Sequence, residues 1–92
     1  PRYGGRVRDT DGVKMRKVSA VISKAGSDSG RVYLVVGTDA RGYALCVDGR
    51  RHKLAAPKSK NVRHLKLTGR EVELPATDHG IASAIARLDI PS

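Results

Sequence analysis

Short apolar runs, separated by turn residues, dominate the first part of the chain. Residues 18–24 and 31–38 are rich in valine and other β-forming residues, and the segment Ala-Gly-Ser-Asp-Ser-Gly lies between them. Runs of this length and composition are typical of strands, and a short loop of small residues between them is typical of a hairpin. We therefore predict that residues 18–24 and 31–38 pair as neighbouring strands.

Three more strands are expected farther along the chain. In residues 43–48 every second side chain is a large apolar one, which is the period of a half-buried strand. The Asp-Gly pair that follows is typical of a two-residue hairpin and predicts a fourth strand over residues 50–54. Residues 61–68 supply either a fifth strand or a short turn followed by that strand, ended by Gly69. Five short strands with tight turns predict a mainly β chain, folded as a small SH3-like antiparallel barrel.

The last part of the chain has the apolar period of a helix. Ile81, Ile85 and Leu88 fall at positions i, i+4 and i+7, and Thr77 or Asp78 can cap the start. This predicts a short C-terminal helix that runs to about residue 88. Its apolar stripe either covers the barrel, which we favour, or is the working surface for a protein partner.

The first residues show no strand or helix period, and three glycines interrupt residues 1–14. The predicted organisation is therefore a basic, flexible arm over residues 1–17, the barrel over residues 18–69, and a linker with the helix over residues 70–92. The basic side chains of the arm are Arg2, Arg6, Arg8, Lys14, Arg16 and Lys17. Such an arm can become ordered on RNA.

Charge points to a phosphate-bearing partner. The 92 residues include 18 Lys and Arg against 9 Asp and Glu. Residues 1–17 carry net +4, residues 18–69 net +7 and residues 70–92 net −2. A basic excess collected in one small module is the electrostatic signature of nucleic-acid binding, although a charge run can also be a solvated face.

The segment from residue 21 to 36, Val-Ile-Ser-Lys-Ala-Gly-Ser-Asp-Ser-Gly-Arg-Val-Tyr-Leu-Val-Val, resembles the KOW motif of ribosomal and transcription-associated proteins. Residues 18–69 as a whole resemble the small bacterial KOW-domain RNA-binding proteins and, less closely, the L14e family of the large ribosomal subunit. The resemblance implies an SH3-like barrel, RNA binding without catalysis, and association with the ribosome. One departure is that Ser27 and Ser29 stand where a basic residue is common in the family, which softens the expected RNA contact of the loop.

The residues expected to contact RNA come from the KOW-like loop and from the basic stretch that follows the third strand. Gly26 and Gly30 are included because their turn would let the backbone approach RNA. The full set is Lys24, Gly26, Ser27, Gly30, Arg31, Arg50, Arg51, His52, Lys53, Lys58, Lys60, Arg63, His64 and Lys66. Tyr33 and Tyr43 are the only aromatic residues of the module and are expected to fill its core or rim, which favours shape recognition of folded RNA over base stacking.

Other chemistries have little support in the sequence. The three histidines and the lone Cys46 lack the paired spacing of zinc ligands, so no metal and no cofactor is expected. The glycine loop lacks the Gly-Lys-Ser/Thr ending of a phosphate-binding loop, and no histidine lies near the loop serines. We expect no enzyme. A single cysteine needs no oxidising compartment, and no apolar run approaches the roughly 20 residues of a membrane span, so a cytoplasmic location is expected.

Two functions follow from these observations. The first is a non-catalytic protein of the large ribosomal subunit, or one associated with the ribosome, that docks on folded ribosomal RNA through its basic face. Neighbouring ribosomal proteins would be further partners, with no membrane and no small-molecule substrate. The alternative is a KOW-type protein-interaction module of the transcription or translation machinery.

Overall fold

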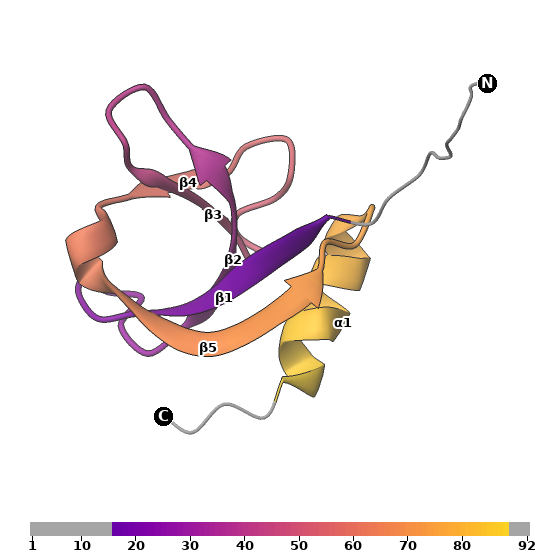
Figure 1. Cartoon of the computed structure of the whole chain (residues 1–92). Coiled ribbons are helices and arrows are strands. Elements are labelled where there is room, and N and C mark those ends of the chain that lie inside the picture. Colours follow the sequence, from indigo (N-terminus) through magenta and orange to yellow (C-terminus); the bar gives the residue numbers. More distant parts are fainter. Residues whose placement is uncertain (1–15, 89–92) are drawn as a thin grey trace.

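The computed structural model describes residues 16–88, which fold into one antiparallel sheet and one helix (Figure 1). Residues 1–15 and 89–92 lie outside the described part, and with them the predicted arm contacts Arg2, Arg6, Arg8 and Lys14. The elements in chain order are β1 (Lys17–Ser23), β2 (Val32–Thr38), β3 (Ala44–Val47), β4 (Lys58–Lys60), the 3₁₀ turn η1 (Val62–His64), β5 (Leu65–Glu73) and α1 (Asp78–Arg87).

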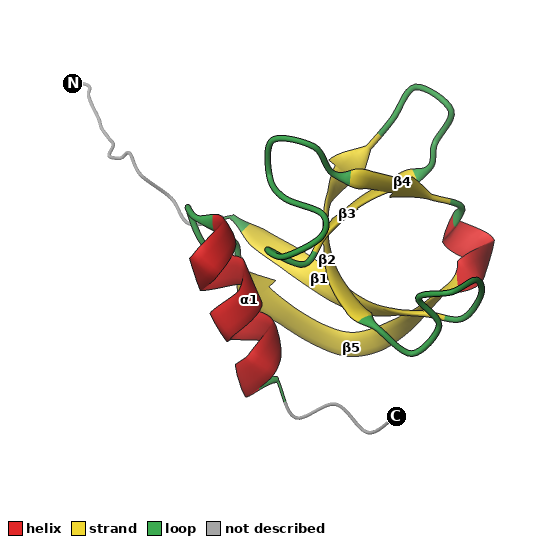
Figure 2. Cartoon of the chain, turned by 180° about the vertical axis from the view of Figure 1, so that it is seen from behind, coloured by secondary structure: helices red, strands yellow, loops and turns green. Residues whose placement is uncertain are grey.

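The prediction of a mainly β chain with five antiparallel strands and a short C-terminal helix is confirmed. The strands lie in the order β4-β3-β2-β1-β5, so β4 and β5 are edges and strand pairing does not close the sheet into a barrel. The sheet is nevertheless strongly curled, and η1 connects its two edge strands (Figure 2). Its inner face lies inside this curl, and α1 lies against its outer face.

The β1–β2 hairpin forms as predicted, with Ala20 opposite Leu34, but the fourth strand was predicted in the wrong place. Residues 50–54 form bends and turns, and the edge strand is instead β4. The cause is Asp48, whose carboxylate Oδ1 accepts hydrogen bonds from the backbone N–H groups of Arg50 and His52, both at 2.9 Å. An aspartate that binds its own loop in this way offers the backbone an alternative to a strand ladder.

The predicted end of the fifth strand at Gly69 is also wrong, because β5 continues to Glu73. The register between β1 and β5 shifts after Ser19, and Gly69 has a φ of +79° in the displaced part of β5. The hydroxyl of Thr68 donates a 2.8 Å hydrogen bond to the carbonyl of Ala20 at the same place. A glycine at such an irregularity resembles a strand end in sequence although the strand continues.

Alternating side chains give the sheet an apolar core on both faces. The outer-face cluster consists of Val18, Ala20, Leu34, Val47 and, from the helix, Ile81. The inner-face cluster consists of Val21, Tyr33, Ala44 and Cys46. Because even and odd positions of β1 and β2 enter different clusters, the two-residue period decides which face each side chain joins.

Helix α1 covers the outer face and does so with the predicted stripe. Ile81 is fully buried, and the partly buried Ile85 and Leu88 pack against the same cluster, so the stripe covers the sheet, as favoured above. Thr77 caps the helix, as predicted, by accepting a 3.0 Å hydrogen bond from the N–H of Gly80. Within residues 16–88 no helix is long and apolar enough to cross a membrane.

The loop between β3 and β4 holds the start of α1 in place. Gly49 has a φ of +78°, and a β-carbon there would overlap the carbonyl oxygen of Asp78 and lie 2.8 Å from the amide nitrogen of Ala82. The carboxylate of Asp78 accepts a 2.8 Å hydrogen bond from the N–H of Leu54. The Asp48-Gly49 pair therefore serves close packing between loop and helix rather than a tight hairpin.

Candidate nucleic-acid interface

The β1–β2 loop, the β3–β4 loop, β4 and η1 together enclose a shallow groove of about 460 Å³. We call it the basic groove. It is lined by Ala25, Gly26, Ser27, Asp28, Arg51, His52, Lys58, Lys60 and His64. Segments far apart in the sequence thus bring many of the predicted RNA contacts into one place.

Two glycines give the β1–β2 loop its shape. Gly26 and Gly30 have φ values of +84° and +90°, in the region that side chains disfavour. A β-carbon at Gly30 would meet nothing within 4 Å, so the requirement there is conformational rather than one of space. The N–H of Gly30 donates to the carbonyl of Ser23 at 2.8 Å, which closes the loop at its base.

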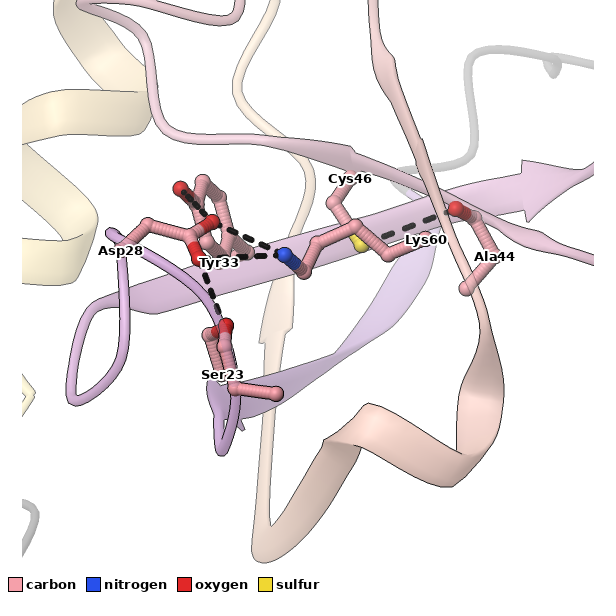
Figure 3. Close-up of polar contacts among 7 residues, drawn as sticks. Ser23, Asp28, Tyr33, Ala44, Cys46 and Lys60 are labelled. Atoms are coloured by element: carbon pink, nitrogen blue, oxygen red, sulfur yellow. Dashed lines mark hydrogen bonds and ion pairs between the residues drawn. The ribbon is translucent and has the colours of Figure 1, made fainter.

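Asp28 lies at the centre of a hydrogen-bond network that crosses the inner face (Figure 3). Its carboxylate accepts hydrogen bonds from the hydroxyl of Ser23 at 3.0 Å and from the phenol of Tyr33 at 2.8 Å. The ammonium of Lys60 forms an ion pair with it at 2.9 Å, and the side chains of Asp28 and Lys60 are only 12% and 11% exposed. We call these four residues the Asp28 network. It ties the β1–β2 loop to edge strand β4, which the loop does not reach by strand pairing.

The electrostatics of the Asp28 network follow from these contacts. The hydrogen bond from Lys60 is the main reason that the pKa of Asp28 lies well below its ordinary value, and the hydroxyls of Tyr33 and Ser23 act in the same direction. Burial, and then the hydrogen bond to Asp28, raises the pKa of the Tyr33 phenol. Asp28 therefore stays ionised and Tyr33 stays protonated at neutral pH, so that each keeps its role as acceptor or donor.

Lys60 consequently differs from the other cations of the groove. Its charge is neutralised by Asp28, whereas Arg51 and Lys58 are exposed and form no ion pair within residues 16–88. His64 is also exposed, and the ring of His52 lies 5.9 Å from the ring of Tyr33, tilted by 45°. Arg51 and Lys58 are thus the side chains of the groove best placed to meet a phosphate.

The ring of Tyr33, a member of the Asp28 network, and the side chain of Cys46 are both part of the buried inner-face cluster. Tyr33 is fully buried, which confirms the prediction that it fills the core. Cys46 is also fully buried, and burial raises the pKa of its thiol to about 11. Tyr43 is half-buried, with the guanidinium of Arg41 4.4 Å from its ring centre, so it lies at the rim.

The structure separates the remaining predicted contacts from the basic groove. Arg31 and Arg50 line a different depression, beside α1. Five further predicted contacts are exposed but do not line the groove, namely Lys24, Gly30, Lys53, Arg63 and Lys66. The backbone N–H of Lys24 donates to the carbonyl of His64 at 2.7 Å, so Lys24 lies next to the groove wall.

The two arm residues that the structure describes lie on the β1 side of the sheet. Arg16 donates from its guanidinium to the carbonyl of Val36 at 2.6 Å, and Lys17 begins β1 opposite Glu73. Neither lines the basic groove.

Reasoning from the sequence missed the acidic centre of this site. Asp28 was expected only as a turn residue, and its partner Lys60 was expected as an RNA contact. The two lie 32 positions apart, and nothing in their local sequence indicates that they meet. Within residues 16–88 no three His, Cys, Asp or Glu side chains are grouped so that they could hold a metal ion.

Comparison with known proteins adds no relative. No protein-family model matches the chain, and no curated protein matches its sequence. The likeness to KOW-domain proteins therefore rests on the residues quoted for it above.

Proposed function

We propose that this chain is a non-catalytic, cytoplasmic RNA-binding protein of the KOW type, an incomplete SH3-like barrel that docks on folded RNA through the basic groove. Ribosomal RNA of the large subunit is the first candidate partner. The observation that carries the proposal is the pair of exposed cations, Arg51 and Lys58, on the wall of a groove whose one carboxylate is already neutralised.

The shape of the groove supports contact with an RNA backbone. Gly26 and Ser27 form one wall without bulky side chains, and Arg51 and Lys58 lie on other segments of the lining. A phosphate entering the groove would find two cations and the small hydroxyl donor of Ser27. Such contacts neutralise phosphates and position the protein without reading sequence.

The same groove argues against catalysis. Asp28, the carboxylate among its lining residues, is occupied by donors from Ser23, Tyr33 and Lys60. A carboxylate with a strongly lowered pKa is a poor general base at neutral pH. Binding therefore accounts for the groove better than acid–base chemistry does.

The test is the salt dependence of RNA binding by the double variant Arg51→Ala/Lys58→Ala. With a fragment of folded ribosomal RNA as the probe, we expect weaker binding and a shallower slope of log affinity against log salt. The slope should fall by about one unit for each phosphate that the variant no longer neutralises. Arg41→Ala/Arg87→Ala removes the same charge from two exposed positions outside the groove. If both double variants change the slope equally, the groove assignment is wrong.

Ribosome association is tested separately. We expect the tagged full chain to sediment with the large subunit in a sucrose gradient and to leave that peak after nuclease treatment. Protein that stays at the top of the gradient at low salt would exclude the ribosome but leave binding to another folded RNA in place.

A further inference from the structure

The inner face of the sheet carries a second groove whose chemistry is unlike that of the first. It has a volume of about 490 Å³ and shares no lining residue with the basic groove. We call it the apolar groove. Its apolar lining consists of Val21, Val35, Ala44, Val62, Leu65 and Leu67, together with Val18, which also belongs to the outer-face cluster. Arg16 and Lys17 complete it at the start of β1, and within residues 16–88 no acidic residue lines it.

Two large apolar side chains in this groove are exposed to water. Leu67 is 74% exposed and Val62 is 56% exposed. Leu67 lies on β5, which pairs with β1 on one side and is an edge of the sheet on the other. An edge strand that presents apolar side chains is a template for an additional strand, and exposed apolar surface of this kind marks interaction sites.

We propose that the apolar groove binds an extended, acidic segment of a partner protein, which adds as a strand along the first half of β5. Its alternate apolar side chains would pack on Leu67 and Val62, and carboxylates at the end of the segment that reaches the start of β1 would lie near Arg16 and Lys17. Strand addition of this kind takes affinity from backbone hydrogen bonds and specificity from the alternate side chains. This site is distinct from the one proposed for RNA and does not depend on it.

Charge decides between the possible occupants. Residues 1–15 are close enough in sequence to reach the groove, but they carry four basic and two acidic side chains, net +2. They would add positive charge beside Arg16 and Lys17. An acidic segment instead complements these two cations and is attracted by the positive charge of the protein.

The arrangement also allows both partners to bind together. The short turn η1 separates the grooves, since His64 lines the basic groove whereas Val62 and Leu65 line the apolar one. RNA and a protein segment would therefore occupy opposite sides of η1. The protein would then join an RNA to a protein tail through one small sheet.

The test uses the full chain, labelled with nitrogen-15, and the capped peptide Glu-Val-Glu-Leu-Glu-Val-Glu-Leu as the probe. We expect amide shift changes in β5, η1 and the start of β1, and at least tenfold weaker binding by Leu67→Asp. Because Leu67 is largely exposed, this variant should keep the fold, which circular dichroism verifies. Lys66→Ala is the matched control, since it changes the net charge equally on the other face of β5.

Several results would overturn the proposal. No shift change at millimolar peptide would do so, as would equal binding of the peptide with Lys in place of Glu, or shifts confined to the basic groove. Shifts of the amides of residues 2–15 on Leu67→Asp without peptide would assign the groove to the chain's own arm. Loss of a dimer by that variant in sedimentation would assign it to a second copy, and a crosslink of RNA to Leu67 would assign it to RNA.

Discussion

The two faces of the sheet are completed by different chemistry. On the outer face, α1 completes an apolar cluster with Ile81. On the inner face, an ion pair between Asp28 and Lys60 joins a loop to an edge strand where no strand pairing does so. We therefore expect the outer face to depend mainly on apolar packing, and the loop of the basic groove to depend on the ion pair of the inner face.

The largest effect is expected from the outer face. Ile81→Ala removes a fully buried side chain and leaves a cavity, which should lower the free energy of unfolding by about 2–5 kcal/mol. Ile81→Val should cost about 0.5–1.5 kcal/mol, which keeps the measurement possible if the first variant does not fold. Urea denaturation measures both. Ala86→Ser, at an exposed position of the same helix, is the control. If Ile81→Ala lowers the free energy of unfolding no more than this control does, Ile81 does not stabilise the outer-face cluster.

A smaller loss is expected from the inner face. Lys60→Met keeps much of the side-chain volume but leaves the Asp28 carboxylate without its cation, which should cost about 1–3 kcal/mol because the pair is nearly buried. Lys58→Met on the same strand is the matched control, since Lys58 is exposed and should change stability by less than about 0.5 kcal/mol. Equal effects of the two variants would mean that the ion pair does not hold the loop.

The inner face should also make the free energy of unfolding depend on pH in the acidic range. The pKa of Asp28 is lowered on folding, chiefly by Lys60, so the unfolded chain binds more protons as the pH falls through the ordinary value of 3.8. The stabilisation is therefore complete above that value and is lost progressively below it. Asp39, whose pKa is lowered to about 2 chiefly by the hydroxyl of Ser59, acts in the same direction.

The variant Asp28→Asn distinguishes the contribution of Asp28 to this pH dependence from that of Asp39. It should be less stable than the natural chain at pH 7, and the difference in unfolding free energy should shrink between pH 5 and pH 2. Denaturation in urea at several pH values measures this. A constant difference across that range would show that the charge of Asp28 does not contribute to folding.

The sequence could predict the elements that are specified by short-range signals, but not those that depend on packing between distant segments. The β1–β2 hairpin and α1 were predictable because short-range signals specify them: two glycines in a loop, and a cap followed by Ile81. The edge strand was not, because the hydrogen bonds that the Asp48 carboxylate accepts from its own loop override the Asp-Gly hairpin signal. Such a competition is decided by packing against α1, which no local pattern reveals.

The candidate site was predictable in its charge but not in its geometry. A run of basic residues after β3 identified Arg51 and Lys58, which line the basic groove. The same run included Lys60, which neutralises Asp28, and Arg50, which lines the depression beside α1 instead. Composition predicts the sign of the charge on a surface. Which group each charged side chain contacts depends on how distant segments come together in the fold.

The smallest and most local effect concerns Cys46, on the floor of the inner face. Its thiol is fully buried and its pKa is raised to about 11, so alkylation in the native state requires opening of the structure. If the inner face opens on its own, Lys60→Met should speed alkylation by about tenfold for each 1.4 kcal/mol of stability lost, because the native state loses a contact that the opened state lacks as well. Ile81→Val should speed alkylation by less than this relation, because the outer-face cluster stays packed during such an opening. Alkylation by iodoacetamide, followed by mass spectrometry at constant pH, distinguishes them. Identical relations in both variants would mean that the two faces open only together, as one cooperative unit.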